Sequence, residues 1–146
     1  MTTEKVGPYL KYALFCRDAE EGPGDELALK GVIDLVDLPE PVDTSGEDQR
    51  ELAEVDVNLV FCISGATPGP HHLLVAIKAP GAPLDLPPPQ RIDWEEGIIF
   101  QRWIKVFRIP VQRSGLHVAA ILFDGAPLGE ASFLVLFIGT GTDTGA

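Results

Sequence analysis

The stretch Leu116–Ile138, LHVAAILFDGAPLGEASFLVLFI, decides the fold. Two apolar runs, Leu116–Phe123 and Leu128–Ile138, flank the dipeptide Asp124-Gly125. Because both residues of such a turn take a positive φ, an Asp-Gly pair between apolar runs is the strongest short-range signal of a β-hairpin. The second run is apolar on both faces, which is typical of a strand buried inside a sheet. The stretch therefore predicts a hairpin and a central strand.

Five further apolar segments lie upstream of this hairpin and are separated by turns rich in proline and glycine. They are Tyr9–Cys16, Leu27–Val36, Val57–Ser64, Leu73–Lys78 and Ile98–Ile109. Short strands at this spacing, joined by unequal connections, are typical of an antiparallel sandwich. We expect an all-β, immunoglobulin-like sandwich of about seven strands, with an eight-stranded barrel as the alternative.

Local patterns predict three details of this fold. Val57–Ser64 and Leu73–Lys78 are close enough to form a hairpin. The alternation of apolar residues slips at Trp103-Ile104, as it would at a β-bulge. A glycine inside a strand, Gly31, indicates a bulge or a close backbone approach.

The length of 146 residues suits one domain, because a chain of this size buries about two-thirds of its surface on folding. We expect a single domain over 1–146, with its core within 7–138 and a frayed tail at 139–146. The proline-rich segment 79–90 cannot be a central strand and is expected to cross a sheet edge. The sequence holds no apolar stretch of about 18 residues, which excludes a membrane-spanning helix.

The opening segments PYLKYALFCRDA (8–19) and LALKGVIDLV (27–36) and the closing segment GLHVAAILFDGAPLGEASFLVLF (115–137) resemble a family of small, uncharacterised bacterial β-sandwich proteins. The shared features are structural: a first strand ending in a cysteine and an acid, a glycine in the second strand and a final hairpin. The resemblance implies an immunoglobulin-like fold. The family carries no assigned activity and no catalytic residues.

The net charge is −11, from 22 acidic and 11 basic residues, and 14 of the acids lie within 18–56. Nucleic-acid binders and anionic membrane surfaces both call for a positive protein surface. We therefore expect no nucleic-acid partner and no membrane. The N-terminus has no apolar run typical of a secretory signal, which indicates a cytoplasmic protein. In that compartment Cys16 and Cys62 are expected to be reduced core residues.

Common catalytic and metal-binding patterns are missing from the sequence. His71 and His72 are adjacent, so a strand would point them to opposite faces, and His117 is distant in sequence. Apolar neighbours blunt the reactivity of the two cysteines, and no G-x-S-x-G motif occurs. We expect no metal site, no cofactor and no catalytic residues.

Asp93, Trp94 and Glu95 form the candidate ligand site. Two carboxylates about 5–10 Å apart beside an aromatic platform are typical of glycosidases. Asp93 and Glu95 could share a strand face, and Trp94 could stack on a sugar.

The segment 99–113 forms the candidate interaction surface, because it has cations and aromatic residues but no acid. The residues concerned are Arg102, Trp103, Lys105, Phe107 and Arg108. Tryptophan and arginine dominate interface energetics. The leading hypothesis is a non-enzymatic binding or interaction module, acting through a sheet face or edge on a protein partner or a second copy. The alternatives are a small carbohydrate- or metal-dependent enzyme or ligand-binding protein using Asp93, Glu95 and Trp94, and a homo-oligomeric structural protein.

Overall fold

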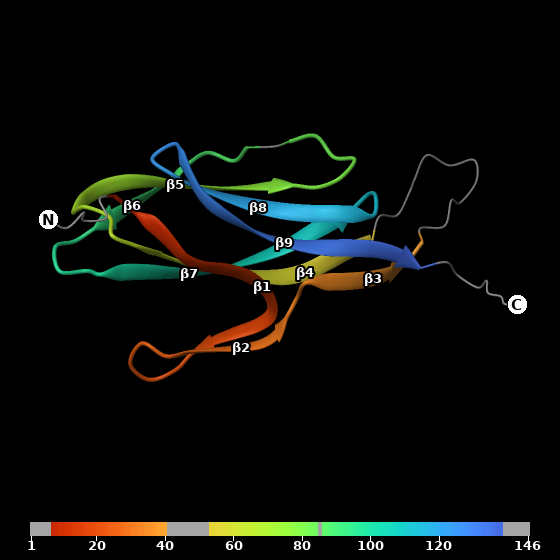
Figure 1. Cartoon of the computed structure of the whole chain (residues 1–146), viewed down its shortest axis with the longest axis horizontal. Coiled ribbons are helices and arrows are strands. Elements are labelled where there is room, and N and C mark those ends of the chain that lie inside the picture. Colours follow the sequence, from red (N-terminus) through yellow and green to blue (C-terminus); the bar gives the residue numbers. More distant parts are fainter. Residues whose placement is uncertain (1–6, 41–52, 85, 139–146) are drawn as a thin grey trace, which may run out of the picture.

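The computed structural model describes residues 7–40, 53–84 and 86–138, and in this part of the chain the strands are joined by turns and loops without a helix (Figure 1). Nine strands are present: β1 (Tyr9–Glu21), β2 (Leu27–Val32), β3 (Leu35–Pro39), β4 (Ala53–Ser64), β5 (Gly69–Lys78), β6 (Gln90–Trp94), β7 (Phe100–Val111), β8 (Gly115–Phe123) and β9 (Ala126–Ile138). Among the described residues, no helix is long and apolar enough to cross a membrane.

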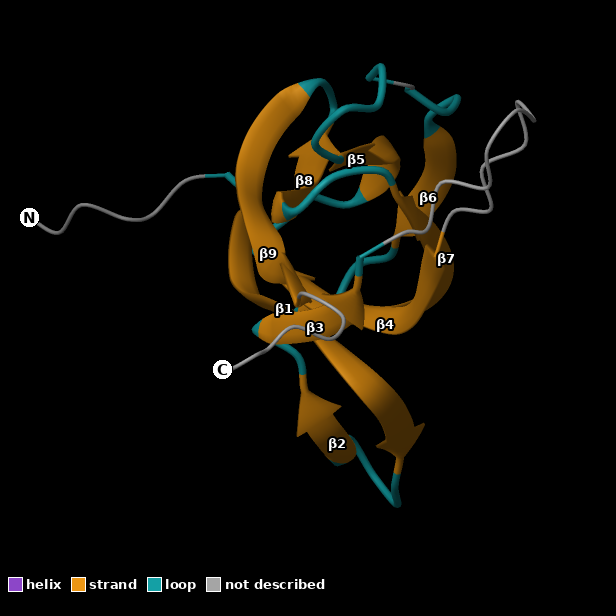
Figure 2. Ribbon diagram, turned by 90° about the vertical axis from the view of Figure 1, so that its right-hand side faces the viewer, coloured by secondary structure: helices purple, strands orange, loops and turns teal. Residues whose placement is uncertain are grey.

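The strands form two sheets (Figure 2). The four-stranded sheet has the order β2-β1-β4-β7, and the five-stranded sheet has the order β3-β9-β8-β5-β6. β3 runs parallel to β9, and every other neighbouring pair is antiparallel. β6 and β7 are edge strands of different sheets and lie on the same side of the molecule, as Figure 2 shows.

The core lies between the two sheets, because alternate residues of each strand point to the same face. Phe15 of β1 and Phe133 of β9 meet edge to face there, with ring centroids 5.0 Å apart. Five consecutive residues of β4, Leu59–Ile63, are almost wholly buried. β4 must therefore be covered on its outer face as well as on its core face.

The outer cover of the four-stranded sheet is the β1–β2 hairpin. Figure 1 shows β1 turning back partway along its length, and both views place the hairpin on the side of this sheet that faces away from the other sheet. Arg102 of β7 donates a hydrogen bond of 3.2 Å to the carbonyl oxygen of Asp25 in the hairpin loop. Val60 and Cys62 are buried on this outer face, where Cys62 lies between Tyr12 of β1 and Arg102 of β7.

The prediction of an all-β protein is confirmed, but the number of about seven strands is wrong. The expected strand Leu27–Val36 is two strands in different sheets. The chain changes sheet at Ile33 and Asp34: the amide of Ile33 bonds to Phe15, and the carbonyl of Asp34 accepts from Leu134. β6 follows the proline-rich segment and was not predicted, because it is only five residues long.

Two local predictions are also wrong. β4 and β5 do not form a hairpin, because the turn between them carries the chain from one sheet to the other. β7 has no bulge at Trp103-Ile104, since its pairing with β4 continues without a shift from Phe100 to Val111. Ile104 interrupts the apolar alternation because the outer face of this sheet is itself partly covered.

The closing hairpin and the two cysteines are as predicted. Asp124 and Gly125 have φ values of 52° and 82°, and β9 lies inside its sheet between β3 and β8. Gly31 has a φ of 67°, and an added Cβ would meet Cγ of Arg17 at 3.1 Å, so this glycine marks a close approach. Cys16 and Cys62 are buried and free. The expected tail at 139–146 lies outside the described residues.

Candidate functional site

The five residues of the expected interaction surface lie on two opposite faces of β7. Pairing with β4 puts Arg102 and Arg108 on the outer face, opposite Cys62 and Asp56. The same register puts Trp103, Lys105 and Phe107 on the core-facing side. Because neighbouring strand residues point in opposite directions, these five side chains do not form one surface.

Both arginines on the outer face already have partners. Arg102 bonds to the carbonyl oxygen of Asp25, and its Nε atom is buried. Arg108 is exposed, but its Nε lies 3.0 Å from the carboxylate of Asp56 and 3.7 Å from that of Glu54. Neither arginine is available as an isolated surface cation.

Trp103 packs against the core. Its ring is stacked on that of Phe61, with centroids 5.2 Å apart and an interplanar angle of 19°. Aromatic pairs of this kind add stability beyond the area that they bury. The position of Trp103 therefore indicates a structural role.

The expected ligand site at Asp93, Trp94 and Glu95 does not form a platform between two acids. Trp94 is 2% exposed, its indole Nε1 donates to the carbonyl of Ile98, and its ring meets Phe123 edge to face. Asp93 is exposed and pairs with Arg91. Glu95 is exposed in the turn after β6. Trp94 is part of the core and cannot stack on a sugar.

A concave site lies where the edge strands of the two sheets meet, and we call it the edge groove. Its volume is about 370 Å³, and it is lined by Leu73, Val75, Pro87, Pro88, Gln90, Lys105, Val106 and Phe107. Two side chains of β7 reach across to β6 beside it. Lys105 Nζ donates to Oε1 of Gln90 at 3.1 Å, and Gln101 Nε2 donates to the carbonyl of Asp93 at 3.1 Å.

Lys105 is the charged group of the edge groove. Within the described residues no ion pair joins its ammonium to a carboxylate. Its hydrogen-bond partner, the Gln90 side chain, is neutral. A lysine directed inward from an edge strand can discourage edge-to-edge aggregation, and it also offers a positive charge to an anionic ligand.

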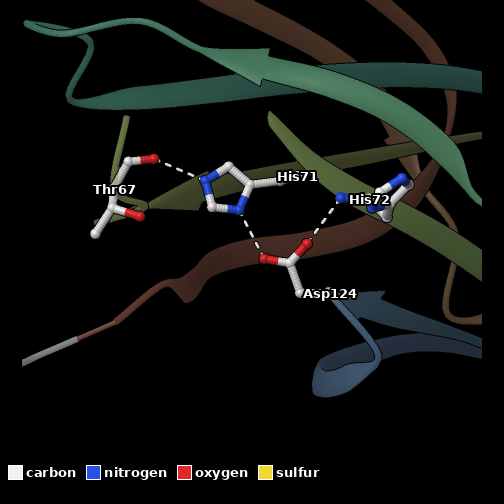
Figure 3. Close-up of polar contacts among 4 residues, drawn as sticks. All are labelled: Thr67, His71, His72 and Asp124. Carbon is white, nitrogen blue, oxygen red and sulfur yellow. Dashed lines mark hydrogen bonds and ion pairs between the residues drawn. The ribbon is translucent and has the colours of Figure 1, made fainter. Parts of the chain in front are cut away.

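His71 belongs to a second polar cluster, shown in Figure 3. Its Nδ1 lies 2.6 Å from Oδ2 of Asp124, and its Nε2 lies 2.7 Å from the carbonyl of Thr67. The other carboxylate oxygen of Asp124 accepts from the backbone N–H of His72 at 2.8 Å. An Asp–His pair can orient a general base, but here Nε2 is occupied by a backbone carbonyl. The cluster instead fastens the β8–β9 turn to the start of β5.

Burial lowers the pKa of His71, but the hydrogen bonds to Asp124 and Thr67 outweigh this effect and raise it above its ordinary value. The bond from His71 lowers the pKa of Asp124. His117 is fully buried, and its burial lowers its pKa. Burial also raises the pKa of the Cys16 and Cys62 thiols, which disfavours the reactive thiolate. Among the residues that the structure describes, no three His, Cys, Asp or Glu side chains gather as a metal site.

Comparisons with known proteins add a likeness in fold. No protein-family model and no curated protein matches the sequence. Among solved structures, the chain is similar to the alkylpurine DNA glycosylase AlkC of Pseudomonas fluorescens bound to DNA containing an abasic-site analog, with 17% identity and a TM-score of 0.53. The likeness covers 91% of this chain but 31% of the glycosylase, so the chain spans about a third of that protein. At this identity the likeness shows the fold alone.

This comparison overturns two expectations from the sequence. The first is the interaction module with a protein partner or a second copy, because the similar structure is an enzyme bound to DNA. The second is the exclusion of nucleic acid, because a protein that contains this fold is bound to DNA. The net charge on which that exclusion rested is unevenly distributed along the sequence: 14 of the 22 acids lie within 18–56, and the rest of the chain carries eight acids and nine basic residues.

Proposed function

We propose that this chain is a DNA-contacting β-sandwich module that meets the sugar–phosphate backbone at the edge where β6 and β7 come together. The observation that carries the proposal is Lys105, a cation in the edge groove whose hydrogen-bond partner, Gln90, is uncharged. The likeness to a DNA-bound glycosylase supports it, since it gives a setting in which such a fold accompanies DNA.

The chemistry of this edge suits a phosphate. Phosphate oxygens in protein–DNA complexes accept hydrogen bonds from lysine and from amide side chains, and these contacts fix the position of the protein without reading sequence. Lys105 and Gln90 supply one group of each kind, 3.1 Å apart. A phosphate at Lys105 would replace a neutral acceptor with a charged one, which gives a shorter and stronger bond.

The uneven distribution of charge sets the expected strength of binding. The acidic segment 18–56 includes β2, at the opposite end of its sheet from β7, but also Glu54 and Asp56 of β4, which lie beside Arg108 of β7 and reduce its positive charge. With one or two phosphate contacts, the logarithm of the binding constant should fall with the logarithm of the salt concentration with a slope of about −1 to −2. Binding is therefore expected to be weak at physiological salt and measurable at low salt.

The test is fluorescence anisotropy of a labelled DNA duplex at several salt concentrations. The variant Lys105→Gln should weaken binding and reduce the salt slope by about 1, because one counterion-releasing contact is lost. The matched control is Arg108→Gln, which removes the same charge from the same strand but from a cation already paired with Asp56. Absence of saturable binding at low salt, or equal effects of the two variants, would refute the proposal.

The proposal keeps five properties expected from the sequence. They are an immunoglobulin-like arrangement of the strands, membership of the bacterial β-sandwich family, a single domain, a cytoplasmic location and a non-catalytic role. The two-sheet architecture is compatible with the first, and the free, buried cysteines are compatible with a reducing compartment. The occupied Nε2 of His71 favours the last.

A further inference from the structure

We propose that the edge groove holds one unpaired base of the DNA, so that the chain prefers single-stranded or locally unpaired DNA to an intact duplex. This inference rests on the proposed function and names the class of DNA that the same site would bind. It follows from the shape of the groove, from its walls and from the polar groups at Gln90 and Lys105.

The walls of the groove suit a flat ring. Phe107 and the rings of Pro87 and Pro88 contribute flat or nearly flat apolar surfaces, and Val75 adds an aliphatic one. Stacking of bases on aromatic side chains is a common means of holding unpaired nucleotides and tolerates any base, because every base has a π-face. The volume of about 370 Å³ falls at the small end of ligand sites, which is ample for one base and too small for a base pair with its backbone.

The polar groups add a requirement that the base be unpaired. Oε1 of Gln90 accepts from Lys105, and within the described residues its Nε2 has no hydrogen-bond partner. That amide nitrogen can donate to a ring nitrogen or carbonyl oxygen on the hydrogen-bonding edge of a base. This edge is used by the complementary strand in a duplex, so it becomes available when the base leaves the stack.

Charge complementarity completes the match. The Lys105 ammonium lies at the same groove, where the phosphate that adjoins an inserted base would supply the missing negative charge. A duplex lying across the β6–β7 edge could reach Lys105 through a phosphate. It could not reach the Phe107 wall, which lies inside the groove.

The experiment compares three DNAs that contain the fluorescent base 2-aminopurine. These are a fully paired duplex, the same duplex with the 2-aminopurine as a single-base bulge, and the single strand. The bulged duplex and the single strand should bind roughly tenfold more tightly than the paired duplex, and their 2-aminopurine emission should change on binding. The paired duplex should show the weaker binding with unchanged emission.

Two variants test the groove. Phe107→Leu removes the aromatic wall while keeping an apolar side chain, and the matched control Phe137→Leu makes the same change in β9, where Phe137 also packs against the core. Gln90→Ala alters an exposed residue and should leave the fold intact, so this variant tests the groove even if Phe107→Leu fails to fold. Phe107→Leu and Gln90→Ala should abolish the preference for unpaired DNA, whereas Phe137→Leu should leave it intact.

The outcomes separate this inference from the proposed function. Equal binding of all three DNAs with unchanged emission would overturn the base site and leave the backbone contact standing. Failure of every DNA to bind would overturn both. Titration with octanoate, an apolar carboxylate, tests whether the groove binds a carboxylate instead of a DNA base. If octanoate binds in a Lys105-dependent manner and no DNA shows a base effect, the groove is a carboxylate site and the inference is wrong.

Discussion

His71 donates from both of its ring nitrogens, to the carboxylate of Asp124 at 2.6 Å and to the carbonyl oxygen of Thr67 at 2.7 Å (Figure 3). An ionised carboxylate and a carbonyl can only accept, so this geometry favours the doubly protonated, positively charged imidazole, which is the form present below the raised pKa of His71. The ring also stacks on Phe123 with centroids 4.8 Å apart. The charged pair therefore joins β5 to the β8–β9 turn at a point where the turn residue Asp124 has a positive φ.

Replacing Asp124 with asparagine should weaken the fold by about 1 kcal/mol at pH 6. A hydrogen bond to a charged group contributes about 1.5–3 kcal/mol, and the exposure of the Asp124 side chain reduces that value. Asparagine tolerates the positive φ and can still accept from the backbone of His72, so the variant isolates the charge. Urea denaturation measures the change.

The same pair gives the wild type a pH dependence that Asp124→Asn should lose. The folded pKa of His71 is raised above 6.5, so its stabilisation is complete below pH 6.5 and is lost as the pH rises through the folded value. The pKa of Asp124 is lowered below 3.8, so the stability that its carboxylate contributes is lost as the pH falls through that lower pKa. A wild-type stability that stays constant from pH 6.5 to 8, or an equal decline in the variant, would contradict this account.

His117 makes the stability of the fold depend on pH in the opposite direction, and it does so below pH 6.5. Its Nδ1 donates to the carbonyl of Gly115, its Nε2 is buried without a partner, and its ring stacks on Phe133. Burial lowers its pKa below 6.5, so the unfolded chain takes up a proton that the folded chain does not. Stability should fall by up to about 1.4 kcal/mol per pH unit as the pH drops below 6.5.

The variant His117→Phe tests this assignment. Phenylalanine keeps the stack on Phe133 and removes the titrating group, so the loss of stability between pH 6.5 and 5 should shrink markedly. The carboxylate of Asp124 titrates at lower pH and His71 at higher pH, so this window isolates His117. An unchanged acid response in His117→Phe would mean that another group is responsible.

Trp103 should act as a core residue. Trp103→Ala is expected to cost about 2–3 kcal/mol, below the value for a fully buried tryptophan because this ring is half-buried. Trp103→Phe keeps an aromatic partner for Phe61 and should recover most of that loss. Urea denaturation followed by circular dichroism distinguishes the two variants. A Trp103→Ala protein as stable as the wild type would show that the stack on Phe61 contributes nothing.

Local signals predicted those features of the fold that depend on a few neighbouring residues. The Asp124-Gly125 turn and the buried strand β9 follow from turn chemistry and from apolar periodicity, which are readable in one short stretch. The free, buried state of the two cysteines followed in the same way from their apolar neighbours.

The sheet order and the edge groove depend on contacts between distant segments. Ile33 and Asp34 carry no turn signal, yet the chain changes sheet there because each bonds to a different distant strand. The buried residues on the outer side of β4, Val60 and Cys62, also depend on the position of the β1–β2 hairpin, which comes from an earlier part of the chain. Likewise, Gln90 and Lys105 are 15 residues apart, and only the meeting of β6 and β7 brings them together.

Cys16 and Cys62 should remain separate thiols under oxidising conditions. Cys16 lies opposite Asn58 on β4, and Cys62 lies opposite Tyr12, four residues along the strand. Four residues span about 13 Å in a strand, whereas the Cα atoms of a disulfide lie about 4.4–6.8 Å apart.

Burial, which raises the pKa of both thiols, should also slow their reaction with Ellman's reagent in the native state. Two thiols should react at once in urea, and intact-mass spectrometry after oxidant treatment should show no loss of two hydrogens. An intramolecular disulfide formed without unfolding would contradict the observed pairing of β1 with β4.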